Sequence, residues 1–167
     1  FDAMRGPKAA AFIASTLMLL QDCPLDMANY YTADTNPWGM FDGFGVPGRA
    51  YYAMVAFNQL AKTPNRVVCG EPDTPQPGIT ICAGLSDDKK TASILVSNFD
   101  DARHPVSLSI QNLPIPQPIE LELFAVNAEH EFSSIQKSTL AADHPTLPLE
   151  LSEHSVYLVR LGIVTSK

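Results

Sequence analysis

A group of aromatic, amide and carboxylate side chains follows a short apolar run in the first quarter of the chain. Its members are Asn29, Tyr31, Asp34 and Trp38. The apolar face of a sugar ring stacks on an aromatic ring, while the sugar hydroxyls bond to carboxylates, amides and phenols. The group therefore predicts contacts to a carbohydrate substrate. The alternative interpretation is that Trp38 and the neighbouring rings only pack a loop against the rest of the fold.

Acid–base chemistry on a glycosidic bond needs a pair of carboxylates that flank the bond. The carboxylates near this group do not suit such a pair. Asp22 follows a predicted helix, Asp26 opens a predicted strand, and Asp42 precedes a glycine in a turn. Asp34 alone is well placed, either as a substrate ligand or as an anchor of the loop. We therefore expect no catalytic residue in this chain.

The sequence shows no pattern of metal ligands or of cofactor-binding loops. Its histidines lie on predicted connections without a cysteine or carboxylate at ligand spacing, which favours surface histidines. They are His104, His130, His144 and His154. No glycine-rich phosphate loop and no serine nucleophile elbow occurs in the sequence. We therefore expect neither a metal nor a cofactor.

The cysteines leave the redox compartment of the protein open. Cys69 and Cys82 flank a turn rich in proline and glycine, so they could form a hairpin disulfide. The alternative is two free thiols. With Cys23 the number of cysteines is odd, and the spacing is not that of a metal site. Localisation stays open as well, with a secreted or periplasmic protein as one option.

Two helices and one strand are predicted to position the aromatic group. Residues 7–21 carry apolar side chains on most of their surface, which is typical of a helix covered on most sides. Residues 25–31 are predicted to form a strand. Residues 32–48 then form a loop rich in glycine and proline, and residues 49–62 form the second helix.

The pattern changes near residue 64, after which short runs of alternating polar and apolar residues predict strands. We place a domain boundary there. Residues 1–64 would be the end of one domain, and residues 65–167 an antiparallel β-sandwich. The predicted strands are residues 78–83, 91–98, 106–110, 119–126, 147–151 and 155–161.

The charge of the chain argues against two classes of partner. The formal net charge is -7, and the 11 Lys and Arg residues are spread thinly, whereas proteins that bind nucleic acid cluster such residues. No apolar run reaches the length that a membrane span needs. We therefore expect no nucleic-acid partner and no membrane partner, and neutral substrates remain compatible with this charge.

Several short motifs in the first third of the chain follow one another in a specific order. They are residues 8–12 (KAAAF), 20–22 (LQD), 26–31 (DMANYY), 39–42 (GMFD) and 50–60 (AYYAMVAFNQL). Taken in series, they resemble the end of the catalytic domain in glycoside hydrolases similar to family 39, the β-xylosidase and α-L-iduronidase group. The resemblance implies the fold class α/β plus all-β. The last βα elements of a (β/α)8 TIM barrel would be followed by an antiparallel β-sandwich.

The resemblance also implies a retaining mechanism, with one glutamate as acid/base after the fourth barrel strand and another as nucleophile after the seventh. Both would lie upstream of Phe1, which is not an initiator methionine. We therefore expect a C-terminal portion of a longer enzyme that is inactive alone and has the remainder of the barrel as its partner. The alternative is a non-catalytic β-sandwich that binds carbohydrate or braces the barrel.

Overall fold

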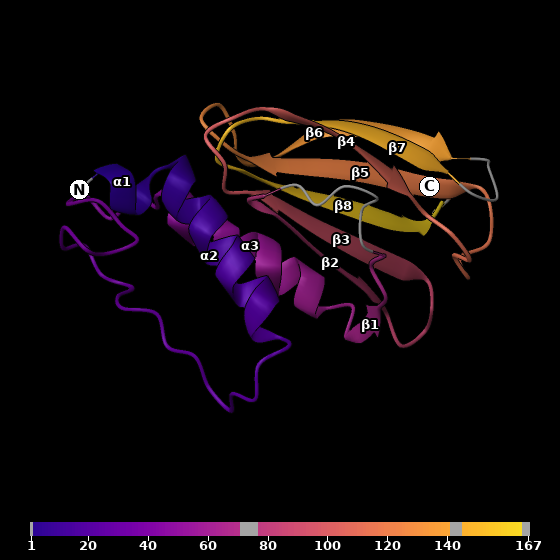
Figure 1. Cartoon of the computed structure of the whole chain (residues 1–167), viewed down its shortest axis with the longest axis horizontal. Coiled ribbons are helices and arrows are strands. Elements are labelled where there is room, and N and C mark those ends of the chain that lie inside the picture. The colour runs from indigo at the N-terminus through magenta and orange to yellow at the C-terminus, as the bar shows by residue number, and fades with distance from the viewer. Residues whose placement is uncertain (1, 71–76, 141–144, 165–167) are drawn as a thin grey trace.

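The computed structural model describes residues 2–70, 77–140 and 145–164, in which a layer of helices covers one face of a large antiparallel sheet (Figure 1). The helices are α1 (Asp2–Arg5), α2 (Pro7–Leu20) and α3 (Arg49–Ala61). The strands are β1 (Asn65–Val67), β2 (Ile79–Leu85), β3 (Thr91–Asn98), β4 (His104–Ser109), β5 (Ile119–Val126), β6 (Glu131–Leu140), β7 (Thr146–Leu151) and β8 (Ser155–Ile163).

The strands form two sheets that pack face to face. Six of them pair in the order β1-β2-β3-β8-β5-β6, and β4 pairs with β7 over one face of this larger sheet. The core between the sheets is aliphatic, with Val96, Leu121 and Leu161 fully buried in it. Alternate residues of β5 supply this core, as the alternating sequence predicts. The predicted antiparallel β-sandwich is therefore confirmed.

Each of the six strands predicted after residue 64 has a counterpart whose ends differ from the prediction by two residues at most. The sequence pattern does not predict β1 or β6. Strand β6 lies at the edge of the sheet, and most of its side chains are exposed. Because a half-solvated edge strand needs no apolar alternation, hydrogen bonding to β5 and not local pattern fixes its conformation.

The two long helices pack closely on each other through alanines. Ala10 and Ala14 of α2 and Ala50 and Ala53 of α3 are all fully buried. Short side chains on both surfaces allow the helix axes to approach closely. The predicted helices, residues 7–21 and 49–62, agree with α2 and α3 to within one residue at each end.

Helix α3 is fixed to the sheet at both ends. At its start, the Arg49 guanidinium donates to the carbonyl oxygens of Asn127 and Ala128, in the turn between β5 and β6. At its end, the carbonyl of Thr63 lies directly on the backbone of Gly84 in β2, where any side chain would overlap it. These contacts set how far the helical layer extends over the sheet.

The strand predicted for residues 25–31 is wrong, because the structure has neither helix nor strand between α2 and α3. A strand forms only where a neighbour pairs with its backbone, and the described residues contain none beside this segment. The buried faces of α2 and α3 contact β2, β3 and β8 instead of barrel strands. The described residues therefore do not show the TIM-barrel part of the predicted fold, and the boundary at residue 64 stays a prediction.

Candidate functional site

The connection between α2 and α3 holds all of the predicted sugar contacts, and its second half is organised by backbone hydrogen bonds. The amide of Met40 donates to the carbonyl of Thr32 at 3.2 Å, and the amide of Gly48 donates to the carbonyl of Met40 at 2.8 Å. Met40 itself is buried. The loop from Thr32 to Gly48 therefore closes on itself and returns the chain to the start of α3.

Asp34 and Trp38 share one tight turn within this loop. The Asp34 carboxylate accepts hydrogen bonds from the Thr35 amide at 2.7 Å and from the Asn36 side-chain amide at 3.1 Å. The Asn36 side-chain oxygen in turn accepts from the Trp38 amide at 2.8 Å. Gly39 is required here, since a Cβ at this position would lie 1.8 Å from the Asp34 carbonyl oxygen. These bonds favour Asp34 as an anchor that presents the half-exposed Trp38.

Tyr30 and Tyr31 have opposite surroundings. Tyr30 packs against the apolar cluster between the helices and the sheet, and burial raises the pKa of its hydroxyl. Tyr31 leaves 80% of its surface exposed. Neighbouring side chains of an extended chain point to opposite sides, which explains why the two rings have different surroundings. Asn29, the remaining predicted contact, is also exposed, in the irregular stretch before the organised loop.

Asp42 stabilises the last turn of the loop. Its carboxylate accepts hydrogen bonds from the amides of Val46 at 2.9 Å and Phe44 at 2.8 Å, and these bonds lower the pKa of Asp42. The neighbouring ring of Phe41 lies against Tyr51 of α3, with 5.5 Å between the ring centroids. The turn that ends the loop is therefore tied to the helix that follows it.

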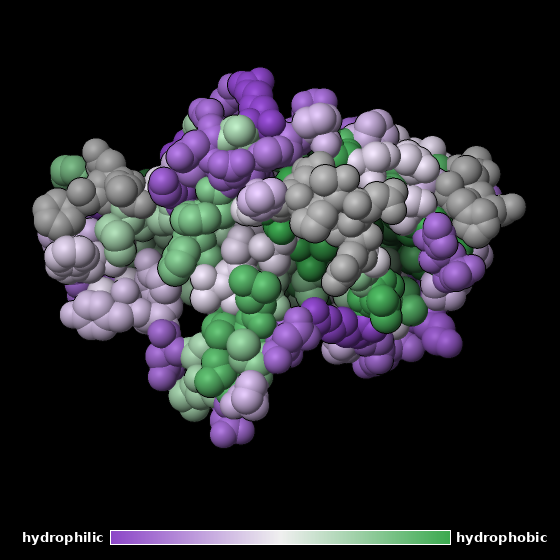
Figure 2. Space-filling view, viewed as in Figure 1, coloured by the Kyte–Doolittle hydropathy of each residue, from purple (hydrophilic) through white to green (hydrophobic). Residues whose placement is uncertain are grey.

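Large apolar side chains on this loop and on the outer face of α2 are exposed to solvent. Figure 2 shows apolar surface along the lower edge of the molecule, where the first part of the loop lies. Each of the following exposes more than half of its surface: Phe12, Leu19, Leu25, Met27, Tyr31, Trp38, Phe44 and Val46. Such a concentration is typical of an interaction surface, because soluble proteins rarely leave so much apolar area uncovered.

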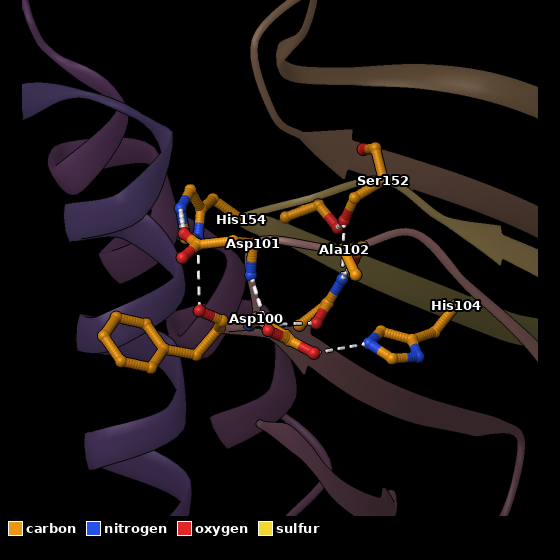
Figure 3. A network of polar contacts seen from close by, with 9 residues as sticks. Asp100, Asp101, Ala102, His104, Ser152 and His154 are labelled. Carbon is orange, nitrogen blue, oxygen red and sulfur yellow. Dashed lines mark hydrogen bonds and ion pairs between the residues drawn. The ribbon is translucent and has the colours of Figure 1, made fainter. Parts of the chain in front are cut away.

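A second polar cluster, not predicted from the sequence, joins the β3–β4 and β7–β8 turns (Figure 3). The buried Asn98 side chain donates to the carbonyls of Ala102 and Ser152, both at 2.8 Å. His104 lies 2.8 Å from the Asp100 carboxylate, a contact that lowers the pKa of Asp100. In the sequence, this pair is visible only as an aspartate that is followed four residues later by a histidine.

His154 completes this cluster from the other turn. Its Nε2 lies 2.6 Å from the Asp101 carboxylate, and its Nδ1 donates to the carbonyl of Phe99 at 3.1 Å. Figure 3 shows these bonds running from one turn to the other. His154 thus links the β7–β8 turn to the β3–β4 turn, whereas His104 bonds within the β3–β4 turn. These bonds give the cluster a structural role, and the prediction of simple surface histidines is incomplete.

The cysteines of the structure are all free. Cys82 is buried under the helices and Cys69 is half-buried, and burial raises the pKa of both thiols. Of the two alternatives left open by the sequence, the structure has the free thiols. In the described ranges no group of three His, Cys, Asp or Glu side chains is arranged to bind a metal ion. No helix in the described part of the chain is long and apolar enough to cross a membrane.

Comparison of the sequence with protein-family models and with curated proteins gives no match. Solved glycoside hydrolases nevertheless share its fold. A glucosidase from Croceicoccus marinus aligns with a TM-score of 0.84 at 21% identity, over 95% of this chain and 42% of that chain. A monomeric β-xylosidase from Caulobacter crescentus CB15 aligns with a TM-score of 0.75 at 14% identity, over 98% of this chain and 43% of that chain.

A family 39 glycoside hydrolase from Xanthomonas axonopodis pv. citri shows the same relation. It aligns with a TM-score of 0.68 at 13% identity, over 97% of this chain and 42% of that chain. The predicted resemblance to the family 39 group is therefore confirmed at the level of the fold. The chain spans less than half the length of each of these structures.

Proposed function

We propose that residues 1–167 form the C-terminal portion of a retaining glycoside hydrolase that cleaves glycosidic bonds in an oligo- or polysaccharide. Both catalytic glutamates lie outside this chain, on the remainder of a TIM barrel. The observation that carries the proposal is the alignment of nearly the whole chain with under half of several glycoside hydrolases. A shared fold supports a shared architecture but does not by itself establish a function. The function must also be argued from the loop between α2 and α3, where the predicted sugar contacts lie.

The exposed loop and α2 face support this assignment independently. Their apolar side chains, among them Leu19, Met27 and Phe44, have no cover within the described residues. A barrel segment packed there would bury them and would complete the α2–loop–α3 unit as its last βα element. The partner is therefore the remainder of the catalytic domain, and the sandwich braces it through the sheet on which α2 and α3 pack.

The substrate contacts lie on the loop between the helices. Tyr31 and Trp38 present exposed rings on which a sugar can stack, and Asn29 offers an amide for its hydroxyls. Asp34 holds the turn and keeps lone pairs free to accept from a substrate hydroxyl. In a (β/α)8 barrel the loops at the carboxyl ends of the strands form the active site, and we propose that this loop takes such a place once the remainder of the barrel is present.

Covalent labelling of the longer protein tests the proposal. A retaining enzyme forms a glycosyl–enzyme intermediate, which a 2-deoxy-2-fluoro glycoside with a good leaving group traps. We expect mass spectrometry of the digested protein to find the label on a glutamate outside residues 1–167. A label on any carboxylate of this chain, or turnover with inversion at the anomeric carbon, would contradict the proposed arrangement.

The two neighbouring tyrosines are expected to differ in their effects. Tyr31→Phe removes one hydroxyl from an exposed ring, so in the longer enzyme kcat/KM should fall by an amount worth about 1 to 3 kcal/mol while Tm stays constant. Tyr30→Ala truncates a half-buried ring, which should cost about 1 to 2 kcal/mol of stability, less than a fully buried ring would. Steady-state kinetics and thermal melts separate the two effects. The reverse pattern would show that Tyr30 is the residue that contacts the sugar.

A further inference from the structure

The side chain of Arg49 contacts the β-sandwich through all three of its nitrogen atoms. Its Nε donates to the carbonyl of Asn127, Nη2 donates to the carbonyl of Ala128 at 2.7 Å, and Nη1 lies 3.6 Å from the Glu131 carboxylate. These partners belong to the turn between β5 and β6 and to the first residue of β6. The planar fork of arginine permits this arrangement, which the single ammonium of a lysine does not reproduce.

The turn that holds Arg49 is itself fixed by side-chain hydrogen bonds. The buried side chain of Asn127 accepts from the amides of Glu129 and His130, both at 2.9 Å. The Nδ2 of Asn127 donates to the hydroxyl of Ser152, in the β7–β8 turn, at 3.3 Å. These bonds tie the β5–β6 turn to a second turn of the sandwich. Arg49 is thus anchored on the sandwich and not on a free loop.

The local features of α3 do not explain an arginine at this position. Arg49 is the first residue of α3, and a positive charge is unfavourable there, because the helix dipole is also positive at the N-terminus. Gly48 has no side chain to cap the helix, and the first turn carries no acidic residue. The first turn of α3 therefore depends on contacts with other elements, among them the bonds from Arg49 to the β5–β6 turn.

Backbone hydrogen bonds connect the start of α3 to the proposed sugar contacts. Gly48 directly precedes Arg49, and its amide donates to the carbonyl of Met40 at 2.8 Å. The amide of Met40 donates to the carbonyl of Thr32 at 3.2 Å. Thr32 follows Tyr31 in the chain. Two hydrogen bonds thus lead from the residue beside Arg49 to the residue beside an exposed ring on which a sugar can stack.

A parallel bond leads to the turn that presents Trp38. The amide of Phe41 donates to the carbonyl of Asp34 at 3.2 Å. The Asp34 carboxylate accepts from the Asn36 side chain, whose oxygen accepts from the Trp38 amide. A shift in the start of α3 would therefore move the proposed sugar contacts at both Tyr31 and Trp38.

We propose that Arg49 is a positioning residue for the substrate loop, through which the β-sandwich fixes where Tyr31 and Trp38 lie in the active site. The sandwich then does more than brace the barrel, because it also holds residues 32–48 in one place relative to the catalytic residues. The role of the two rings as sugar contacts rests on the proposed function. The coupling between Arg49 and the loop does not depend on that function.

Hydrogen exchange of the longer protein, followed by mass spectrometry, measures this coupling directly. In Arg49→Ala the amides of residues 39–48 should exchange roughly 10-fold faster, because their hydrogen bonds open when the first turn of α3 frays. Arg66→Ala is the matched control. It removes another arginine of the helix–sheet contact, which bonds to the Asp22 carboxylate at 2.7 and 2.8 Å beyond the end of α2. Exchange in residues 39–48 should be unchanged in this control.

Steady-state kinetics of the longer protein test whether the coupling matters for the substrate. Rings that bind the sugar alike in the ground state and in the transition state affect KM and not kcat. Arg49→Ala should therefore raise KM roughly 5- to 10-fold and leave kcat within about 2-fold. In a Trp38→Ala background the same substitution should raise KM by only about 2-fold, because one of the rings that Arg49 positions is gone. Arg66→Ala should leave KM unchanged.

The outcomes separate this inference from the proposed function. Faster exchange of the loop together with a raised KM supports both. If no hydrolysis or labelling occurs in any protein, yet Arg49→Ala speeds exchange in the loop alone, the coupling stands and the proposed function falls. If the enzyme is active and Arg49→Ala behaves as Arg66→Ala does, the inference is overturned. It is also overturned if the KM ratio is the same with and without Trp38, since Arg49 would then have only a general structural role.

Should Arg49→Ala fail to fold, Arg49→Lys provides the second variant. Lysine keeps the positive charge but has a single ammonium in place of the guanidinium fork, so it can replace only part of the contact with the β5–β6 turn. The protein should stay folded, while loop exchange and KM each rise roughly 2- to 4-fold. A folded Arg49→Lys protein in which both quantities are unchanged overturns the inference.

Discussion

Residues 1–167 expressed alone are expected to hydrolyse no aryl glycoside, whereas the longer protein that contains them should turn it over. Retaining catalysis needs two carboxyl groups about 5 Å apart across the bond, one of them free to attack. The candidate loop offers no such pair, since Asp34 and Asp42 each bond to backbone amides of their own turns. Enzymes of this kind accelerate hydrolysis by many orders of magnitude. The longer protein should therefore show clear turnover, and residues 1–167 alone should show none. Release of nitrophenol, followed by absorbance, measures it.

Two variants sharpen this comparison. In the longer protein, Asp34→Asn should reduce turnover only modestly, because the amide oxygen can still accept the hydrogen bond from the Thr35 amide. Addition of the isolated chain to a separately expressed upstream segment should restore part of the activity if the two refold together. Clear turnover by residues 1–167 that disappears with Asp34→Asn would move the chemistry into this chain and contradict the proposed function.

The helices were predictable because their information is local. Pro7 suits the first turn of α2, and the runs of alanine and leucine favour helix without any help from distant residues. The sequence also shows the faces of α2 to be apolar nearly all round. What it does not show is the surface that covers them. One side packs on the sandwich sheet, and Phe12 and Leu19 on the other side stay exposed in this chain.

Strands are less predictable where pairing decides their conformation. Residues 25–31 are predicted as a strand, yet the described part of the chain holds no neighbour with which they pair, and they are irregular in the structure. The opposite case is β6, whose polar sequence carries no signal and which pairs with β5 along its whole length. The partner of β6 is the neighbouring strand β5, and residues 25–31 have no partner among the described residues. In both cases backbone pairing, and not the local pattern, decides the conformation.

The candidate site likewise has features that the sequence predicts and features that it does not. The alternation of neighbouring side chains predicts that Tyr30 packs on the helical layer while Tyr31 faces away from it, and the burial of the two rings agrees. Their contact with a sugar stays a prediction. A polar groove beside the end of α3, which Ser93 and Gly162 help to line, could not be predicted, because it depends on the row of the sheet at which α3 stops. That row is set by one glycine.

Gly84→Ala is expected to cost about 3 kcal/mol of stability or more. A Cβ at Gly84 would lie 2.0 Å from the carbonyl oxygen of Thr63 and 2.8 Å from its hydroxyl oxygen. The Thr63 hydroxyl cannot move freely, because it donates to the carbonyl of Leu60 at 2.7 Å in a buried position. The end of α3 must therefore lift off β2, which opens the apolar cluster around Leu60. Denaturant unfolding and thermal melts measure the loss, and Tm should fall by roughly 6 to 12 °C.

Gly162→Ala is the matched control for this substitution. It makes the same chemical change on the helix-facing side of the same sheet, but a Cβ at Gly162 lies 3.8 Å from the nearest atom. Without overlap, the main effect of the methyl group is to reduce the freedom of the unfolded chain, which should stabilise the protein by about 0.4 to 1 kcal/mol. Opposite signs for the two alanines would locate the cost at the contact between α3 and β2. Equal losses would instead mean that both strands need the flexibility of glycine, and that the helix does not rest on Gly84 as closely as described.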